Sequence, residues 1–175
     1  VRTMADFGLS DEIKGSMKKY KTSNWDLYFD RTRSLYKAQK KDDNDEDLMY
    51  FITPAESTNE LYADYANRNR VLRKNIMGDD YLLKDTIPRV SWKIMHDIRI
   101  ISGYECRKAI GRINDTVYVV AFYTVEILVR GGPEGFSGLP GMILGLAIPR
   151  LNTTWFATKV EAFTNFNNEI QPPNK

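Results

Sequence analysis

The stretch of the chain that decides the fold is Gly131-Gly132-Pro133-Glu134-Gly135-Phe136-Ser137-Gly138-Leu139-Pro140-Gly141-Met142-Ile143-Leu144. Six of the eleven glycines lie between Gly131 and Gly145, together with two of the seven prolines. Glycine suits backbone that needs positive φ or close approach, and proline fixes φ and removes a hydrogen-bond donor. We therefore expect a loop of fixed shape that leads directly into an apolar strand over residues 142–148.

This glycine-rich loop does not match a nucleotide-binding loop. A P-loop needs a lysine and a hydroxyl residue after its last glycine, whereas Met142 and Ile143 follow Gly141. Phosphate-binding loops also point the N-terminus of a helix at the anion, and this loop is expected to enter a strand. No nucleotide or other cofactor is therefore expected.

Outward from the loop, most of the chain consists of short segments in which apolar and polar side chains alternate, as in half-buried strands. The predicted strands are 25–29 with 33–37 as its continuation, 48–52, 60–65, 69–76, 81–83, 90–100, 104–110, 116–127, 142–148 and 153–163. A helix is expected near the N-terminus, where the favoured N-cap residue Ser10 precedes Asp11 and Glu12. Short polar turns between strands indicate an antiparallel meander, so we predict an α+β fold with one antiparallel β-sheet.

Composition limits the classes of partner. A chain of 175 residues fits one domain, here expected over 1–164 with a flexible tail over 165–175. The formal net charge of +2 is too balanced to make nucleic acid or an anionic membrane an obligate partner. The longest apolar run, residues 142–148, is far shorter than the roughly 20 residues that cross a bilayer, so no transmembrane segment is predicted.

Neither of the two most reactive side chains has an obvious chemical partner. His96 is the only histidine and Cys106 the only cysteine, which excludes an internal disulfide and a multi-histidine metal site. Alternation places His96 in line with Trp92, which predicts a buried histidine, with ligand binding or pH sensing as the alternative. Cys106 shares a face with Tyr104 and is expected to be a small buried hydrophobe, unless a base lies beside it in space. No catalytic or metal-binding residues are predicted.

The second half of the chain resembles the GLPGLI family of bacterial envelope proteins. The family signature corresponds to residues 138–144, with Met142 in place of the usual leucine, and Gly132-Pro133 and Phe136-Ser137 precede it at the family's spacing. The upstream elements that resemble the family are Trp92-Lys93-Ile94, Gly103-Tyr104-Glu105-Cys106, Ala121-Phe122-Tyr123-Thr124 and Glu126-Ile127. The resemblance covers about residues 90–148 and departs from the family pattern at Phe122, Leu128 and Gly145.

The resemblance implies an exported protein in the periplasm or at the outer membrane of a Gram-negative bacterium. Members carry no established enzyme activity, and many are encoded beside outer-membrane transport genes. By analogy with periplasmic lipoprotein carriers, the sheet is expected to curve around a helix. Since the chain begins at Val1 rather than Met, we expect it to lack a first strand and a signal peptide.

The first functional hypothesis is a non-enzymatic accessory subunit of an outer-membrane complex, acting in TonB-dependent transport, protein insertion or secretion. It would dock on outer-membrane or periplasmic proteins through residues of the loop and its neighbours. These are Gly132, Pro133, Phe136, Gly138, Leu139, Pro140, Gly141, Met142, Ile143, Trp92, Tyr104 and Tyr123. Because several strands carry apolar residues on both faces, a periplasmic carrier of a lipid or hydrophobic peptide is the alternative. An uncharacterised hydrolase is the third reading.

Overall fold

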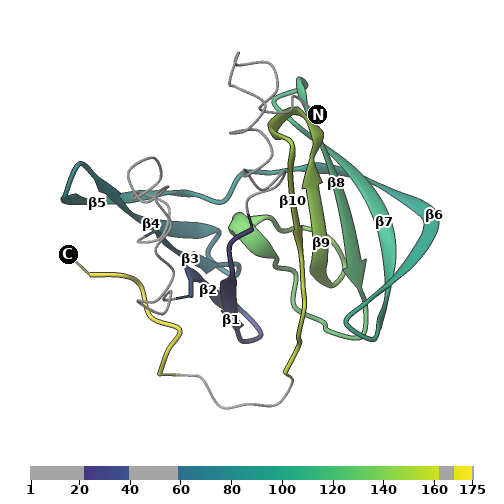
Figure 1. Cartoon of the computed structure of the whole chain (residues 1–175), viewed down its shortest axis with the longest axis horizontal. Coiled ribbons are helices and arrows are strands. Elements are labelled where there is room, and N and C mark those ends of the chain that lie inside the picture. Colours follow the sequence, from purple (N-terminus) through teal and green to yellow (C-terminus); the bar gives the residue numbers. More distant parts are fainter. Residues whose placement is uncertain (1–21, 40–58, 162–167, 175) are drawn as a thin grey trace, which may run out of the picture.

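The computed structural model describes residues 22–39, 59–161 and 168–174, which form two antiparallel five-stranded sheets (Figure 1). The N-terminal sheet contains β1 (Trp25–Phe29), β2 (Arg33–Ala38), β3 (Glu60–Asp64), β4 (Asn69–Ile76) and β5 (Asp79–Thr86). The C-terminal sheet contains β6 (Ser91–Ile101), β7 (Tyr104–Ile113), β8 (Val117–Thr124), β9 (Met142–Ile148) and β10 (Thr153–Phe156). In both sheets each strand pairs with its neighbour in the sequence.

The predicted α+β fold with a single sheet around a helix is wrong. The helical segments in the described part of the chain are the 3₁₀ turns η3 (Pro133–Gly135) and η4 (Pro149–Leu151), and the helix expected after Ser10 and the strand over 48–52 lie outside that part. The meander divides between β5 and β6, where the connection over 87–90 contains Pro88, which has no backbone N–H to give to a ladder. Within these ranges no helix has the length and apolar character needed to span a membrane.

The first hairpin corrects the prediction that residues 33–37 continue the first strand. The carboxylate of Asp30 accepts hydrogen bonds from the backbone N–H groups of Thr32 and Arg33, at 2.8 Å each. An Asp side chain that accepts a hydrogen bond from the backbone two residues further on forms an Asx-turn, which reverses the chain. The chain therefore reverses, and Phe29 pairs with Ser34 in the antiparallel register.

The exposure of one face of β6, which also contains a bulge, corrects the prediction of a buried His96. Ile94 pairs with Ala109 and Ile98 with Arg107, so four residue steps on β6 oppose two on β7. The row of side chains expected to be buried with His96 lies at the surface, because Ile94, Ile98 and Ile100 are 45%, 55% and 64% exposed. His96 lies inside the bulge and is exposed. The expectation for Cys106 is confirmed, because its side chain is fully buried.

Three apolar clusters hold the described residues together. The first covers one face of the C-terminal sheet and contains Ala109, Val119, Ala121, Tyr123, Leu139, Ile143, Leu146 and Ile148. The second joins the two sheets, since Leu27, Phe29 and Tyr65 pack against Cys106 and Met142. The third lies on the face of the N-terminal sheet opposite to the one that carries Leu27 and Phe29.

That third cluster involves the tail that the sequence predicts to be flexible. Ile170 is only 1% exposed and packs with Leu35 of β2 and Tyr62 of β3. Tyr28 and Val71 pack against the same cluster. Residues 168–174 therefore help to cover the N-terminal sheet, and the other face of that sheet is directed towards the glycine-rich loop.

Candidate functional site

The glycine-rich loop packs between the two sheets, where its turn η3 contacts β2, β3 and β9 (Figure 1). A Cβ atom on Gly141 would lie 1.9 Å from the carbonyl oxygen of Thr124, so only glycine fits there. Gly135 has φ of +74°, and a Cβ there would lie 2.9 Å from a methyl group of Leu61. The concentration of glycine thus reflects close approach of the loop to both sheets.

The structure places most of the residues predicted for docking in or next to the core. Gly132, Leu139, Gly141, Met142, Ile143 and Tyr123 are buried, while Pro133, Phe136, Trp92 and Tyr104 are half-buried. Gly138 and Pro140 are exposed. The Trp92 indole N–H donates a hydrogen bond of 2.9 Å to the Ser137 carbonyl, which fastens the loop to β6. These residues therefore have a packing role, and a docking role for them stays a prediction.

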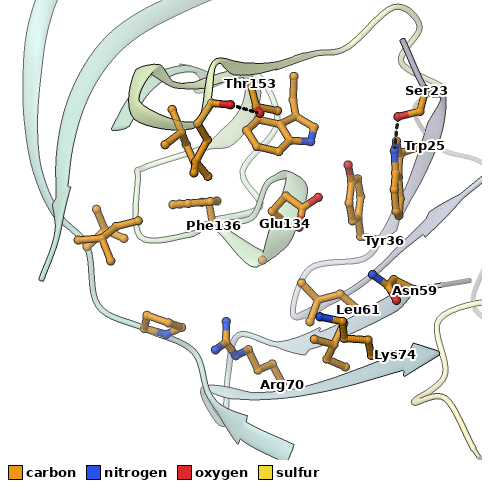
Figure 2. Close-up of a pocket in the computed structure, with 18 residues that line it drawn as sticks. Ser23, Trp25, Tyr36, Asn59, Leu61, Arg70, Lys74, Glu134, Phe136 and Thr153 are labelled. Atoms are coloured by element: carbon orange, nitrogen blue, oxygen red, sulfur yellow. Dashed lines mark hydrogen bonds between the residues drawn. The ribbon is translucent and has the colours of Figure 1, made fainter. Parts of the chain in front are cut away.

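A cavity of about 540 Å³ opens beside the loop, between the two sheets (Figure 2). Its aromatic lining residues are Trp25, Tyr36, Phe136 and Trp155, and its aliphatic ones include Leu61, Leu72, Val90, Ile113, Ile148 and Leu151. The polar lining residues are Ser23, Asn59, Arg70, Lys74, Glu134 and Thr153. This size and this largely apolar lining with a few polar groups are typical of ligand sites.

Sequence reasoning missed this cavity. Its lining comes from strands of both sheets, from the connection between β5 and β6 and from the loop, which are far apart along the chain. The alternation in β1 and β4 indicates which of their side chains share a face, and it could have grouped Trp25 with Leu27, and Arg70 with Lys74. It could not have shown that these two faces meet Phe136 and Trp155.

Tyr36 is the central polar group of the cavity. Its ring stacks on Trp25 with centroids 4.9 Å apart and an angle of 8° between the planes. The residue is only 5% exposed, and within the described residues its hydroxyl makes no hydrogen bond of good geometry. Burial, and secondly the nearby Glu134 carboxylate, hold the pKa of Tyr36 well above its ordinary value. The phenol is therefore neutral at physiological pH and can donate a hydrogen bond.

A second buried polar atom in the cavity lining lacks a partner. The Asn59 Oδ1 oxygen is inaccessible to solvent and accepts no hydrogen bond from the described residues. A buried polar atom without a partner costs about 1–3 kcal/mol, so such atoms are uncommon away from binding sites. In Figure 2 the Asn59 side chain lies beside Trp25 and Tyr36.

Charged groups stand on opposite walls of the cavity. Arg70 and Lys74 project from the same face of β4, and the Arg70 guanidinium pairs with Asp85 at 2.9 Å. Glu134 belongs to η3 on the loop side and has left-handed backbone geometry, with φ of 56°. Non-glycine residues in this conformation are uncommon and occur preferentially at functional sites. The cavity can thus present a cation and an anion to the same ligand.

Cys106 and His96 do not form a catalytic pair. Burial raises the pKa of the Cys106 thiol, and its Sγ contacts the carbonyl oxygen of Tyr104 at 3.5 Å. A buried, protonated thiol is a poor nucleophile. His96 is on the exposed bulge of β6. In the part of the chain that the structure describes, no three His, Cys, Asp or Glu side chains are grouped as a metal site would require.

Known proteins resemble parts of this chain or its fold. PNGF-II, solved in space groups C2 and P21, aligns with TM-scores of 0.54 and 0.55 and 15% sequence identity in each case. The alignments cover 73% and 74% of this chain but 22% and 23% of the PNGF-II chain, so this chain spans less than a quarter of that protein. Identity this low shows a shared fold and nothing further.

No curated protein matches the chain significantly. A family described as "Protein of unknown function (Porph_ging)" matches residues 111–145, which contain β8 and the glycine-rich loop.

Proposed function

We propose that this protein is a non-enzymatic binding protein of the bacterial envelope that captures an apolar peptide segment of a partner protein in the cavity between its sheets. The observation that carries the proposal is the pair of buried polar atoms, Tyr36 Oη and Asn59 Oδ1, which line an aromatic cavity and make no hydrogen bond of good geometry with the described residues, although Trp155 and Glu134 lie close to the Tyr36 hydroxyl. A ligand that supplies a donor and an acceptor at these positions would remove the cost of burying them.

A peptide fits these requirements better than an acyl chain does. The backbone of a peptide offers an N–H group to Asn59 Oδ1 and a carbonyl oxygen to the Tyr36 hydroxyl, and its side chains can contact the aromatic walls. An acyl chain would fill the apolar volume but leave both polar atoms unpaired. Aromatic rings supply most of the contact energy at such sites, and Trp25, Phe136 and Trp155 surround the polar pair.

The charges on the walls add direction to this interaction. Arg70 and Lys74 on β4 would attract an acidic side chain or a terminal carboxylate, and Glu134 would attract N–H groups or a cation. Because the two signs stand on opposite walls, a peptide that carries an acidic group at one end should bind in one orientation.

Location and partner class follow from the resemblance to the GLPGLI family. We propose a periplasmic protein, associated with the outer membrane, that serves as an accessory subunit in TonB-dependent transport, protein insertion or secretion. The resemblance at the signature over residues 138–144 is what supports this placement, and the Porph_ging match over 111–145 falls on the same segment. The inaccessible Cys106 thiol and the separate, exposed His96 favour binding over hydrolysis.

The test is a comparison of peptide and lipid binding by the purified chain. An array of apolar decapeptides with and without an acidic end is probed, and affinities for the strongest peptides and for palmitate are measured by tryptophan fluorescence. Tyr36→Phe removes only the hydroxyl and should weaken peptide binding about fivefold. Leu72→Trp should block the cavity, whereas Tyr81→Phe on β5, outside the cavity, should bind normally. Binding of palmitate but no peptide would replace this proposal with the lipid-carrier alternative.

A further inference from the structure

The face of the C-terminal sheet that does not carry the first apolar cluster has a marked charge asymmetry. The register places Lys93 beside Ile110, Arg99 beside Cys106 and Arg112 beside Tyr118, so these residues share one face with Lys108. No Asp or Glu occupies a paired position on this face in the described strands. Asp97, in the bulge of β6, lies 3.9 Å from Lys108 and offsets part of one charge. Cys106 and Met142 share this face but are fully buried in the second cluster, so we call the exposed part that carries the cations the basic face.

Apolar side chains on the basic face are exposed next to these cations. Phe156 of β10 is 67% exposed and Tyr118 of β8 is 50% exposed. The Arg99 guanidinium lies 4.6 Å from the ring centre of Phe122, and the Arg112 guanidinium lies 4.8 Å from that of Tyr118. A groove of about 370 Å³ lies between the two edge strands, β6 and β10. Its lining residues include Arg99, Ile101, Val120, Phe122, Thr154 and Phe156.

We propose that the basic face docks on the surface of an anionic phospholipid bilayer. The charge on this face is complementary to anionic headgroups, and each lysine or arginine close to such a surface strengthens binding about fivefold. Exposed aromatic side chains settle at the headgroup level of membranes, which gives a role to Phe156 and Tyr118. An acidic protein surface would satisfy the cations alone. A bilayer also offers the apolar acyl-chain region below its headgroups, which Phe156 and the apolar residues of the groove can contact.

The nearly balanced net charge of the chain conceals this asymmetry. The formal charge of +2 argued against an obligate anionic membrane partner. In the N-terminal sheet cations and carboxylates are interspersed, as in the pairs Arg70–Asp85 and Arg73–Glu60, whereas the paired positions of the basic face carry cations without a carboxylate. Net charge therefore says little about one face, and the paired register of β6 and β7 is what reveals the basic face.

The experiment is co-sedimentation of the full chain with vesicles of phosphatidylcholine alone and of phosphatidylcholine with 30% phosphatidylglycerol, at low and physiological salt. The chain should bind the anionic vesicles preferentially, and salt should weaken that binding. The double variant Arg99→Gln with Arg112→Gln should bind about 30-fold more weakly. Arg99→Lys with Arg112→Lys keeps both charges and should retain binding, as should the control Lys84→Gln on β5. Phe156→Ser should also weaken binding.

Three results would overturn the proposal. The first is failure to bind anionic vesicles at low salt, and the second is binding that the two Arg→Gln changes leave unaltered in a folded variant. The third is tight binding of soluble polyglutamate that competes with the vesicles and is unaffected by Phe156→Ser, which would identify an acidic protein as the partner. None of these residues belongs to the proposed peptide cavity, so the Tyr36→Phe and Leu72→Trp variants should bind vesicles normally.

Discussion

Replacing Gly141 by alanine is the sharpest test of the claim that the glycine-rich loop is held by close backbone contact. The added Cβ would lie 1.9 Å from the Thr124 carbonyl oxygen and 2.7 Å from its carbonyl carbon. These are backbone atoms at the end of β8, and Thr124 is fully buried, so no side-chain rotation can relieve the overlap. One strand or the loop must move.

The expected loss of stability follows from this geometry. Overpacking that side chains can partly absorb costs about 1–3 kcal/mol, and a fixed backbone contact belongs at or above the upper end of that range. We therefore expect the free energy of unfolding to fall by about 3 kcal/mol or more, and the melting temperature by about 6–12 °C. The backbone of Gly141 is not in the left-handed region. If the added Cβ met no other atom, Gly141→Ala would therefore stabilise the chain by roughly 0.4–1 kcal/mol.

Urea unfolding of Gly141→Ala beside Gly103→Ala separates the steric effect from backbone strain. Gly103 has φ of +83°, and a Cβ there would meet nothing within 4 Å. Its substitution should therefore cost only the left-handed strain of about 1–2 kcal/mol. If Gly141→Ala proves no more destabilising than Gly103→Ala, with an unchanged dependence on urea, the steric account of the loop is wrong.

Three further predictions concern buried polar groups. Trp92→Phe keeps an aromatic ring but removes the donor to the Ser137 carbonyl, and it should cost about 1–3 kcal/mol in urea unfolding, because that acceptor loses its partner. The Cys106 thiol should not react with iodoacetamide in the native state at pH 8, because its side chain is fully buried and burial raises its pKa; denaturation in urea should restore ordinary reactivity at that pH. The pKa of Tyr36 is raised in the folded state, so above about pH 10 tyrosine ionises in the unfolded chain first and stability falls as the pH rises. Tyr36→Phe should lack this part of the loss when unfolding is compared at pH 8 and pH 11, and an identical pH dependence in both proteins would contradict the assigned environment.

Local patterns predicted the bounds of several strands, whether half-buried like 25–29 or buried on both faces like 142–148. The segments 25–29, 69–76 and 142–148 appear in the structure with the bounds that were predicted. Errors arose where one side chain redirects the backbone and where an apolar face is exposed. Asp30 closes a hairpin inside what looked like one long strand, and the face of β6 that carries Ile94, Ile98 and Ile100 is exposed rather than buried.

The division into two sheets and the two candidate surfaces required information that one sequence does not contain. Strand pairing is non-local, so nothing in residues 87–90 except Pro88 indicates that the ladder stops there. The cavity depends on the meeting of Trp25, Tyr36 and Trp155 from three strands. The basic face depends on the register of β6 against β7, because a shift of one residue would move Arg99 and Lys93 to the opposite side.

The sequential pairing of strands within each sheet has a consequence for the order of folding. Since consecutive strands pair within each sheet, both sheets can grow by successive hairpin formation, over short turns except at the connections 39–59 and 125–141. Contacts of this local kind form quickly. The glycine-rich loop joins β8 to β9 but packs against β2 and β3, so its contacts connect segments far apart in the sequence. Docking of the loop should then be the late, rate-limiting step. The cavity beside it would exist only in the completed protein, so a newly synthesised or partly unfolded chain could not engage the ligand prematurely.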